Sequence, residues 1–414
     1  MPQFVLENVS LFQSDSGCIR PEVSVLVDDA RVAAVEPSST SFGDARRHDC
    51  RGLYLLPGLI DCHVHVAAVH HDLFKLSLQP ASLVTAQAKG VLEGMLARGF
   101  TTVRDAGGAD FGLREALEQG FLSGPRLFIA GRPLTQTGGH ADARPRGASR
   151  MPCACAGLGL PGAVADGVPE VRKAAREQLR NGANQIKVMA GGGVASPTDP
   201  IDGTQYSVEE LRAACEEAAA AGTYVMAHAY SPAAITRAVE AGVRTIEHGN
   251  LLDEPSARAM RRAGATLVPT LATYAALAHE GLRLGWPESM LAKLERVRDR
   301  GLEAIRVARA EGVPIAFGTD LLGAMHSRQG SEFLLRAAAL QPAEILQSAT
   351  SIAAGVLGRS GALGVVARGA VADLLLLSSD PTEDLAPLAS GAGLVAVLQG
   401  GRVAAGALPR APAI

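Results

Sequence analysis

Six side chains in this sequence could together bind divalent metal ions. Two of them form a His-x-His pair, His63-Val64-His65, and in a strand both imidazoles would project to the same side because side chains alternate. The others come much later in the chain: Lys187, His228, His248 and Asp320. Imidazole nitrogens and carboxylate oxygens are the ligands that a zinc-like ion prefers. A His-x-His pair alone is weak evidence, so the positions of the others decide whether a site exists.

Lys187 lies in the middle of the apolar run Gln185–Met189. In a strand its neighbours Ile186 and Val188 would face the surrounding helices and send the lysine inward. A buried, unpaired ammonium costs several kcal/mol, so a lysine there must be paired, neutralised or chemically modified. The alternative is a lysine that reaches solvent at the strand end.

Eight short apolar runs alternate with amphipathic runs of helical period, which is the pattern of βα units around a parallel sheet. The predicted strands are Leu59–Val66, Thr101–Ala106, Arg126–Ala130, Gln185–Met189, Tyr224–Ala229, Thr245–Gly249, Thr266–Thr270 and Pro314–Asp320. Eight units predict an α/β fold, a closed (β/α)8 TIM barrel. The first, fourth, fifth, sixth and eighth strands would present the candidate ligands at one mouth, where barrel active sites lie.

The sequence between these strands carries helix signals. Ser207 and Glu210 form a predicted capping box, and Ser231 before Pro232 is a predicted N-cap. Charged and apolar residues recur at helical spacing in five runs, which predicts an outer ring of helices: Glu170–Asn181, Ser207–Ala221, Ala233–Ala241, Asp253–Ala263 and Met290–Glu311.

The two ends of the chain differ from the middle. Residues 1–54 and 361–414 contain short apolar strands separated by Asp, Gly and Pro, and they predict one small β-sandwich domain built from both termini. Residues 55–360 are then the metal-dependent barrel and catalytic domain. The connection 132–168 is long for a βα loop and lies after a strand, so it is a candidate lid or specificity loop.

Composition excludes several classes of protein. The chain has 39 basic and 42 acidic residues and a net charge of -3, which gives no field suited to nucleic acid or an anionic membrane. From the sequence we expect no signal peptide and no segment that spans a bilayer. The six cysteines are scattered, as expected of free thiols, and Cys153 and Cys155 have no further ligand nearby. These features predict a cytoplasmic protein without a nucleic-acid or membrane partner.

Several motifs resemble those of the metal-dependent amidohydrolase superfamily. They are LPGLIDCHVH at 56–65, the Lys187 strand, AHA at 227–229, IEHGN at 246–250, GTD at 318–320 and GAVADLLL at 369–376. The chain is most similar to the branch with Xaa-Pro dipeptidase and imidazolonepropionase-like members, especially the dipeptidase-type proteins in which a lysine ends the fourth strand. The resemblance implies a hydrolase of carbon–nitrogen bonds in a small amide or dipeptide.

In such relatives the lysine is carboxylated and its carbamate bridges two divalent metals. The resemblance therefore implies two ions, with zinc as the expected metal. One ion would be bound by His63, His65 and Asp320. The other would be bound by His228 and His248, and carboxylated Lys187 would bind both ions.

The resemblance also implies a mechanism. A hydroxide bridging the two metals would attack the substrate carbonyl, with Asp320 as the general base that returns the proton to the departing amine. His140 would hydrogen-bond the carbonyl or oxyanion, and Tyr230 would reach the substrate carboxylate or carbonyl. Arg144 or Arg146 could pair with a terminal carboxylate, although a solvated loop arginine is the simpler interpretation.

The expected substrates are Xaa-Pro or Xaa-hydrophobic dipeptides and N-acyl amino acids. The alternatives are a mononuclear cyclic-amide hydrolase or deaminase of the imidazolonepropionase kind, and a bulky aromatic amide hydrolase on the same scaffold. A non-catalytic scaffold is a third possibility. The presence of a suitable residue at all six ligand positions argues against it. Lys187 distinguishes the binuclear dipeptidase from the mononuclear cyclic-amide hydrolase or deaminase, because mononuclear relatives do not use the lysine of the fourth strand. We also expect a homo-oligomer.

Overall fold

The computed structural model describes residues 3–144, 158, 161–196, 199–280 and 285–409. These residues form two compact units. One contains the chain up to Asp61, Glu93–Val103 and everything from Gly330 onward, and the other contains Cys62–Leu92 and Arg104–Gln329. The domain boundaries expected from the sequence, 1–54 with 361–414 and 55–360, stay a prediction.

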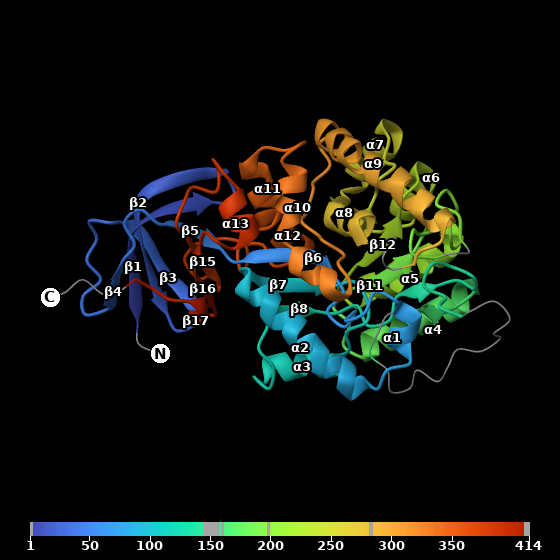
Figure 1. Ribbon diagram of the computed structural model, residues 1–414, viewed down its shortest axis with the longest axis horizontal. Coiled ribbons are helices and arrows are strands. Elements are labelled where there is room, and N and C mark those ends of the chain that lie inside the picture. Colours follow the sequence, from blue (N-terminus) through green and yellow to red (C-terminus); the bar gives the residue numbers. More distant parts are fainter. Residues whose placement is uncertain (1–2, 145–157, 159–160, 197–198, 281–284, 410–414) are drawn as a thin grey trace. The chain divides into compact units, whose positions relative to one another are not determined.

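The first unit contains one mixed sheet built from both ends of the chain. Its strands are β1 (Phe4–Gln13), β2 (Cys18–Asp28), β3 (Arg31–Pro37), β4 (Arg46–Asp49), β5 (Tyr54–Pro57), β15 (Leu374–Leu377), β16 (Leu394–Gln399) and β17 (Arg402–Gly406). The order is β17-β16-β15-β5-β1-β2-β3, with β4 paired to β1, so the blue and red strands of Figure 1 belong to one sheet. The two termini therefore fold together as predicted, while the sandwich arrangement stays a prediction.

Strand β15 shows why the two ends need each other. All four of its leucines are buried, and it is hydrogen-bonded to β5 on one side and β16 on the other. Leu374 and Leu376 pack with Leu6 and Leu55 of the N-terminal strands in one apolar core. Neither terminal segment alone could remove these side chains from water.

Short helices complete the first unit: α10 (Ser331–Arg336), α11 (Pro342–Ser348), α12 (Ser351–Val356) and α13 (Ala386–Ser390). In α10 the buried Glu332 accepts a hydrogen bond of 2.7 Å from Arg336 Nε. Glu332 and Arg336 lie one helical turn apart and form an ion pair within α10.

The second unit is α/β, and most of its strands are parallel and short. A three-stranded sheet has the order β6 (Leu59–Val64), β7 (Phe100–Asp105) and β8 (Arg126–Phe128). The residues of β6 up to Asp61 and those of β7 up to Val103 belong to the first unit. A six-stranded sheet has the order β10-β9-β11-β12-β13-β14. Its strands are β9 (Leu134–Thr135), β10 (Ala163–Val164), β11 (Ile186–Met189), β12 (Val225–Ala229), β13 (Thr245–His248) and β14 (Thr266–Val268). Seven of the eight predicted barrel strands are thus present as strands.

The eighth predicted strand, Pro314–Asp320, is not a regular strand. Ile315 forms an isolated bridge to Leu267 of β14, and the Phe317 carbonyl accepts a hydrogen bond of 2.8 Å from Cys62 N of β6. Asp320 has a φ of 55°, which ends the extended conformation. The segment lies between β14 and β6, but the strands form two separate sheets, so closure of a barrel is not shown.

Helices flank the parallel strands of the second unit (Figure 1). The five predicted helices are present as α4 (Gly167–Arg180), α5 (Val208–Ala220), α6 (Pro232–Glu240), α7 (Glu254–Ala263) and α9 (Glu288–Ala310). The others are α1 (Leu73–Ser77), α2 (Ala81–Ala97), which continues into the first unit, α3 (Phe111–Glu118), α8 (Leu271–Glu280) and the 3-10 helix η1 (Gly323–Arg328).

Helix α5 begins with the predicted capping box. Ser207 Oγ accepts a hydrogen bond from Glu210 N at 3.2 Å, and Glu210 Oε2 accepts one from Ser207 N at 2.7 Å. Helix α6 begins with the predicted N-cap, because Ser231 Oγ accepts from Ala234 N. These contacts satisfy backbone N–H groups that a helix start leaves without partners.

The long connection 132–168 contains β9 and β10 where the structure describes it. Residues 145–157 and 159–160 of this connection, and with them Arg146, Cys153 and Cys155, lie outside the described residues. No helix in the described part of the chain is both long and apolar enough to cross a bilayer.

Candidate metal centre and catalytic pocket

The six candidate ligands line one cavity of the second unit, although they come from distant parts of the chain. The cavity has a volume of about 120 Å³. His63 lies in β6 and His65 just beyond its end, while Lys187, His228 and His248 lie in β11, β12 and β13. Parallel pairing sets β11 to β13 in register, with Met189 opposite His228 and Ala229 opposite His248. The structure therefore brings together all six residues that the strand pattern predicted to meet.

Three of these side chains are close enough to share one metal ion. One ligand atom each from His63, His65 and Asp320 lies within 4.8 Å of the others. Asp320 Oδ1 is 3.0 Å from His65 Nε2 and 3.5 Å from His63 Nε2. Its left-handed backbone conformation is unusual for aspartate and is held by a hydrogen bond of 2.8 Å from Asp320 N to the His63 carbonyl.

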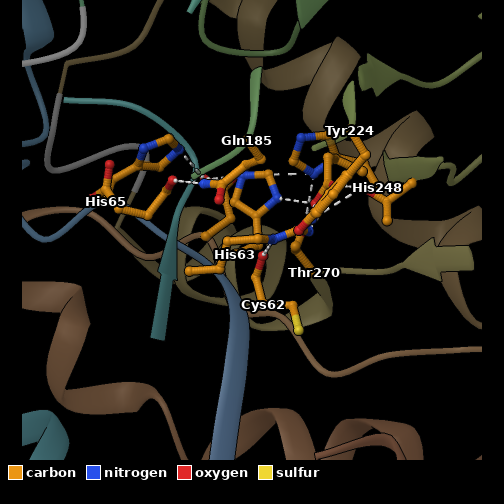
Figure 2. A network of polar contacts seen from close by, with 12 residues as sticks. Cys62, His63, His65, Gln185, Tyr224, His248 and Thr270 are labelled. Carbon is orange, nitrogen blue, oxygen red and sulfur yellow. Dashed lines mark hydrogen bonds and ion pairs between the residues drawn. The ribbon is translucent and has the colours of Figure 1, made fainter. Parts of the chain in front are cut away.

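A protein partner fixes the orientation of each imidazole. His63 Nδ1 lies 2.7 Å from Glu247 Oε2, His65 Nδ1 lies 2.8 Å from the Gly107 carbonyl, and His248 Nδ1 lies 2.8 Å from Thr270 Oγ1. Figure 2 shows these contacts for the labelled histidines and Thr270. With Nδ1 engaged in this way, Nε2 is the nitrogen offered to a ligand.

His228 uses the opposite nitrogen. Its Nε2 donates to the Gly192 carbonyl at 3.0 Å, which leaves Nδ1 as the nitrogen offered to a ligand. The ring contacts that of His248, with a distance of 4.6 Å between centroids. His228 and His248 thus form a second pair of imidazoles beside the first.

A buried arginine supports the first pair from behind. Arg104 Nη2 donates to both carboxylate oxygens of Glu247, at 3.0 and 3.1 Å, and Arg104 Nε donates to the Cys62 carbonyl at 2.6 Å. Tyr224 and Thr245 hydroxyls accept from Arg104 Nη1. Because the charge of Glu247 is balanced by that of Arg104, its carboxylate can be buried and still hold His63 in place.

Burial sets the charge of the imidazoles. Loss of solvation lowers the pKa of His63, His228 and His248 well below the usual value, so these rings are neutral at neutral pH. Burial also acts on His65, but the hydrogen bond and charge of Asp320 outweigh it and raise the pKa of that ring. Neutral imidazole is the form that binds a metal ion.

Lys187 is 1% exposed, as its position in the strand predicted. Burial lowers the pKa of its amine to about 8, against the opposing charges of Glu247 and Asp320. In a fraction of the molecules Lys187 is therefore a neutral amine near neutral pH. A neutral amine is nucleophilic, whereas an ammonium is not. The pKa of Asp320 is lowered, because His63, His65 and Lys187 together outweigh burial, so its carboxylate is ionised.

This donor set fits divalent metal ions. It combines four oriented imidazoles, an ionised carboxylate and a lysine that burial makes reactive, all around one cavity. A cluster of buried histidines, each held by a polar partner, has little structural value of its own, since apolar residues would fill the space at lower cost.

The two predicted substrate residues line the same cavity. The His140 ring stacks on that of His228, with 4.4 Å between centroids. The Tyr230 hydroxyl lies 2.9 Å from that of Tyr274, a buried residue of α8. Tyr274 was missed by the sequence analysis, because α8 is apolar on most sides and carries no motif. Polar residues directly after the seventh predicted strand could have indicated Tyr274, because residues at that end of a barrel strand lie at the active site.

Arg144 does not lie in the cavity lining among the described residues. Its guanidinium instead binds Asp142, with distances of 2.7 Å and 2.5 Å from Nε and Nη2 to the two carboxylate oxygens. His326 of η1 is buried, and its Nε2 lies 3.2 Å from the Ala68 carbonyl.

The rest of the cavity lining is mostly apolar. It consists of Leu73, Ala141, Met189, Val194, Ala195, Thr273, Leu277 and Leu322. Such a wall beside a polar centre suits a small molecule that has an apolar group next to its reactive bond.

Fold and site together are those of a metal-dependent hydrolase of carbon–nitrogen bonds. The chain belongs to the amidohydrolase family, whose model matches residues 54–404. It is therefore a hydrolase that acts on carbon–nitrogen bonds, in a family whose members depend on metal ions and take small-molecule substrates.

Characterised relatives show the range of the family. The chain is 34% identical over 367 residues to ochratoxinase of Aspergillus niger, covering 84% of this chain and 75% of that protein. It is 27% identical over 423 residues to imidazolonepropionase of Rubrobacter xylanophilus, covering 91% and 90%.

Solved structures agree with this placement. A prolidase complexed with N-methylphosphonate-L-proline has a TM-score of 0.94 and 47% identity, covering 99% of this chain and 100% of that one. A Xaa-Pro dipeptidase with methionine bound in its active site has a TM-score of 0.87 and 28% identity, covering 97% and 99%. The predicted resemblance to the Xaa-Pro dipeptidase and imidazolonepropionase-like branch is confirmed.

Proposed function

We propose that this protein is a binuclear metal-dependent amidohydrolase that cleaves the C–N amide bond of Xaa-Pro or Xaa-hydrophobic dipeptides or of N-acyl amino acids. The observation that carries the proposal is the meeting of four oriented imidazoles, Lys187 and Asp320 around one cavity with an apolar wall. The similarity to a prolidase and a Xaa-Pro dipeptidase supports the dipeptide class.

The distances support the first ligand set, and the resemblance implies the others. His63, His65 and Asp320 would hold one ion, and His228 and His248 the other, with carboxylated Lys187 shared. The neutral amine of Lys187 can attack CO₂, forming an N–C bond and releasing one proton, and the resulting carbamate is an anion. When bound, the metal ions supply Lewis acidity and lower the pKa of water toward neutrality. Zinc is the proposed metal, since imidazole and carboxylate donors suit it.

Protein groups carry out the proton transfers in this proposal. Asp320, ionised and with a side chain 21% exposed, accepts the proton of the attacking water and returns it to the nitrogen of the departing amine. His140 and Tyr230, both in the cavity lining, hydrogen-bond the substrate carbonyl and carboxylate. The apolar wall excludes water from the bond that breaks.

Two further elements belong to the proposal. We take the two sheets of the second unit to be parts of a closed (β/α)8 barrel over residues 55–360. We take residues 1–54 with 361–414 to be a β-sandwich domain. Homo-oligomer formation and a cytoplasmic location stay predictions from the sequence.

A substrate panel tests the reaction class. Purified protein loaded with a defined amount of zinc is assayed with Xaa-Pro dipeptides, Xaa-Leu and Xaa-Phe dipeptides, and N-acyl amino acids. We expect release of free amino acid from at least one of these classes. Bulky aromatic amides test the alternative of an aromatic amide hydrolase on the same scaffold.

Metal content tests the binuclear centre. We expect two ions per chain in the wild type and a loss of activity of at least about 1,000-fold in Lys187→Met, which cannot form a carbamate. Incubation with ¹³C-labelled CO₂ should give a carbamate signal that Lys187→Met lacks. One ion per chain without a carbamate, together with turnover of a cyclic amide, would establish the imidazolonepropionase-like alternative instead.

A further inference from the structure

Two tyrosine hydroxyls pair in the wall of the cavity. Tyr230 follows β12 and Tyr274 lies in α8, so the two residues come from different elements. Their hydroxyl oxygens are 2.9 Å apart, and both residues are buried and line the cavity. Apart from the candidate ligands and His140, these hydroxyls and that of Thr273 are the polar side-chain groups of the described lining. The pair is therefore a polar spot on an otherwise apolar wall.

Packing holds both rings. The centroid of the Tyr230 ring is 4.8 Å from that of His228 and 5.4 Å from that of His248. The Tyr274 ring lies with its centroid 6.2 Å from that of His248. The Tyr230 carbonyl also accepts a hydrogen bond of 3.2 Å from Leu251 N. With the rings held in this way, the freedom left to each hydroxyl is rotation of its O–H bond about the C–O bond.

The number of protons decides what the pair can offer to a substrate. Each phenol hydroxyl donates one hydrogen bond and can also accept. Burial raises the pKa of both tyrosines above the usual value, so both hydroxyls are protonated near neutral pH. One of the two protons joins the two oxygens, and the other is left for a third group in the cavity.

Which tyrosine keeps the second proton follows from the role of Tyr230. In the proposed function Tyr230 donates to the substrate, and that role is a premise here. Because Tyr230 has one proton, the hydrogen bond between the two tyrosines must then be donated by Tyr274. A hydroxyl that accepts one hydrogen bond also becomes a stronger donor of its own, since neighbouring hydrogen bonds polarise each other.

We propose that Tyr274 is a positioning residue for Tyr230. Its O–H donates to the Tyr230 oxygen, so that the Tyr230 O–H is directed into the cavity. There it donates to the carboxylate of the amino acid that the hydrolysis releases. The inference thus deepens the proposed function by assigning the second hydroxyl of the carboxylate site, and it rests on that function.

Tyr274→Phe removes only the hydroxyl that holds Tyr230. With a substrate from the panel, we expect KM to rise about 3- to 10-fold while kcat changes less than about twofold. The carboxylate lies away from the bond that breaks, so its contact is equally strong in the ground state and in the transition state. A fall in kcat with unchanged KM would overturn the inference.

Tyr206→Phe is the matched control. Tyr206 is buried like Tyr274, but it is not in the described cavity lining, and its hydroxyl has no hydrogen-bond partner among the described residues. Removing this hydroxyl should leave both KM and kcat unchanged.

A substrate without the carboxylate separates positioning from general damage. For an Xaa-Pro dipeptide this is the aminoacyl pyrrolidide, whose KM, or Ki where it only inhibits, is compared between wild type and Tyr274→Phe. We expect the two proteins to bind the pyrrolidide equally well. A loss as large as that for the dipeptide would show that Tyr274 supports the cavity as a whole and not the carboxylate contact.

A double variant tests whether Tyr274 acts through Tyr230. Tyr230→Phe alone should raise KM about 10-fold or more, because it removes the donor itself. If Tyr274 acts by holding Tyr230, Tyr274→Phe should then cost nothing further. Increases in KM that multiply in the double variant would mean that Tyr274 acts independently of Tyr230, which contradicts the inference.

Binding of the free amino acid gives a readout that needs no turnover. Calorimetric titration of the zinc-loaded protein with L-proline and L-phenylalanine should show about 3- to 10-fold weaker binding by Tyr274→Phe than by the wild type. Equal binding by both proteins, or no binding by the wild type, would reject the carboxylate site. Failure of the wild type on the whole substrate panel would reject the proposed function, while this titration still decides whether Tyr274 supports carboxylate binding.

Discussion

The contacts behind the imidazoles determine how well each could bind a metal ion. His248 depends on one hydroxyl, since its Nδ1 lies 2.8 Å from Thr270 Oγ1. Thr270→Val replaces that hydroxyl by a methyl group of similar shape, so the ring keeps its packing but loses the partner that fixes its tautomer. We expect metal affinity to fall about 10-fold or more. Equilibrium dialysis followed by elemental analysis measures it.

Thr270→Ser is the matched control, because it keeps the hydroxyl. If both variants bind metal as tightly as the wild type, the hydroxyl does not orient His248. Loss in both would instead point to the methyl group and to packing.

At this scale the sequence predicts the candidate ligands better than their supports. His63, Lys187 and His248 could be found because each lies in a short apolar run whose position along the chain is regular. Asp199 and Tyr274 could not. Asp199, whose Oδ2 lies 3.5 Å from His140 Nδ1, is outside the helices and strands, and Tyr274 lies in the helix that follows β14.

At the scale of elements, the irregular segment 314–320 approaches β6 and β14 so closely at Gly318 that the position favours glycine. A Cβ on Gly318 would lie 2.6 Å from Val268 Cγ1 of β14 and 2.9 Å from His63 Cβ of β6. We therefore expect Gly318→Ala to lower the free energy of unfolding by about 1–3 kcal/mol and to disturb metal binding through His63. Chemical denaturation and metal analysis measure the two effects.

Gly90→Ala is the control with the opposite sign. Gly90 is exposed within α2, and an added Cβ meets nothing within 4 Å. Alanine should stabilise the helix by up to about 1 kcal/mol without any effect on metal content. Equal stability changes in the two variants would show that the close approach at Gly318 has no energetic consequence.

Elements with strong local signals were the predictable ones. Helix α5 has a capping box and α6 a proline after its N-cap serine, and both begin within a residue or two of the predicted starts. The segment 314–320 was predicted as a strand from its apolar residues, but Gly318 and the positive φ of Asp320 make it irregular. Strands β9 and β10 have two residues each, too few for a periodic pattern.

At the scale of the whole molecule, the cost of burying Lys187 should appear in the stability of the metal-free protein. The pKa of its amine is about 8 in the folded chain and near the ordinary lysine value of 10.5 in the unfolded chain. Between these values the unfolded state binds more protons, so the free energy of unfolding rises with pH. Below about pH 8 the full penalty applies, and above about pH 10.5 it is gone.

The difference between wild type and Lys187→Met isolates this effect from the buried tyrosines and cysteines, which titrate in both proteins. In metal-free, CO₂-free buffer, we expect the wild type to gain about 3 kcal/mol relative to the variant from pH 7.5 to 10.5, since each unit of pKa corresponds to about 1.4 kcal/mol. Urea denaturation at a series of pH values measures the difference. If the difference in free energy of unfolding between the two proteins does not change with pH, the amine is solvated in the folded protein. The argument that burial favours a carbamate on Lys187 would then fail. Where the expected pH dependence is found, adding zinc and bicarbonate to the wild type should remove it, because a carbamate shared by two cations replaces the buried ammonium.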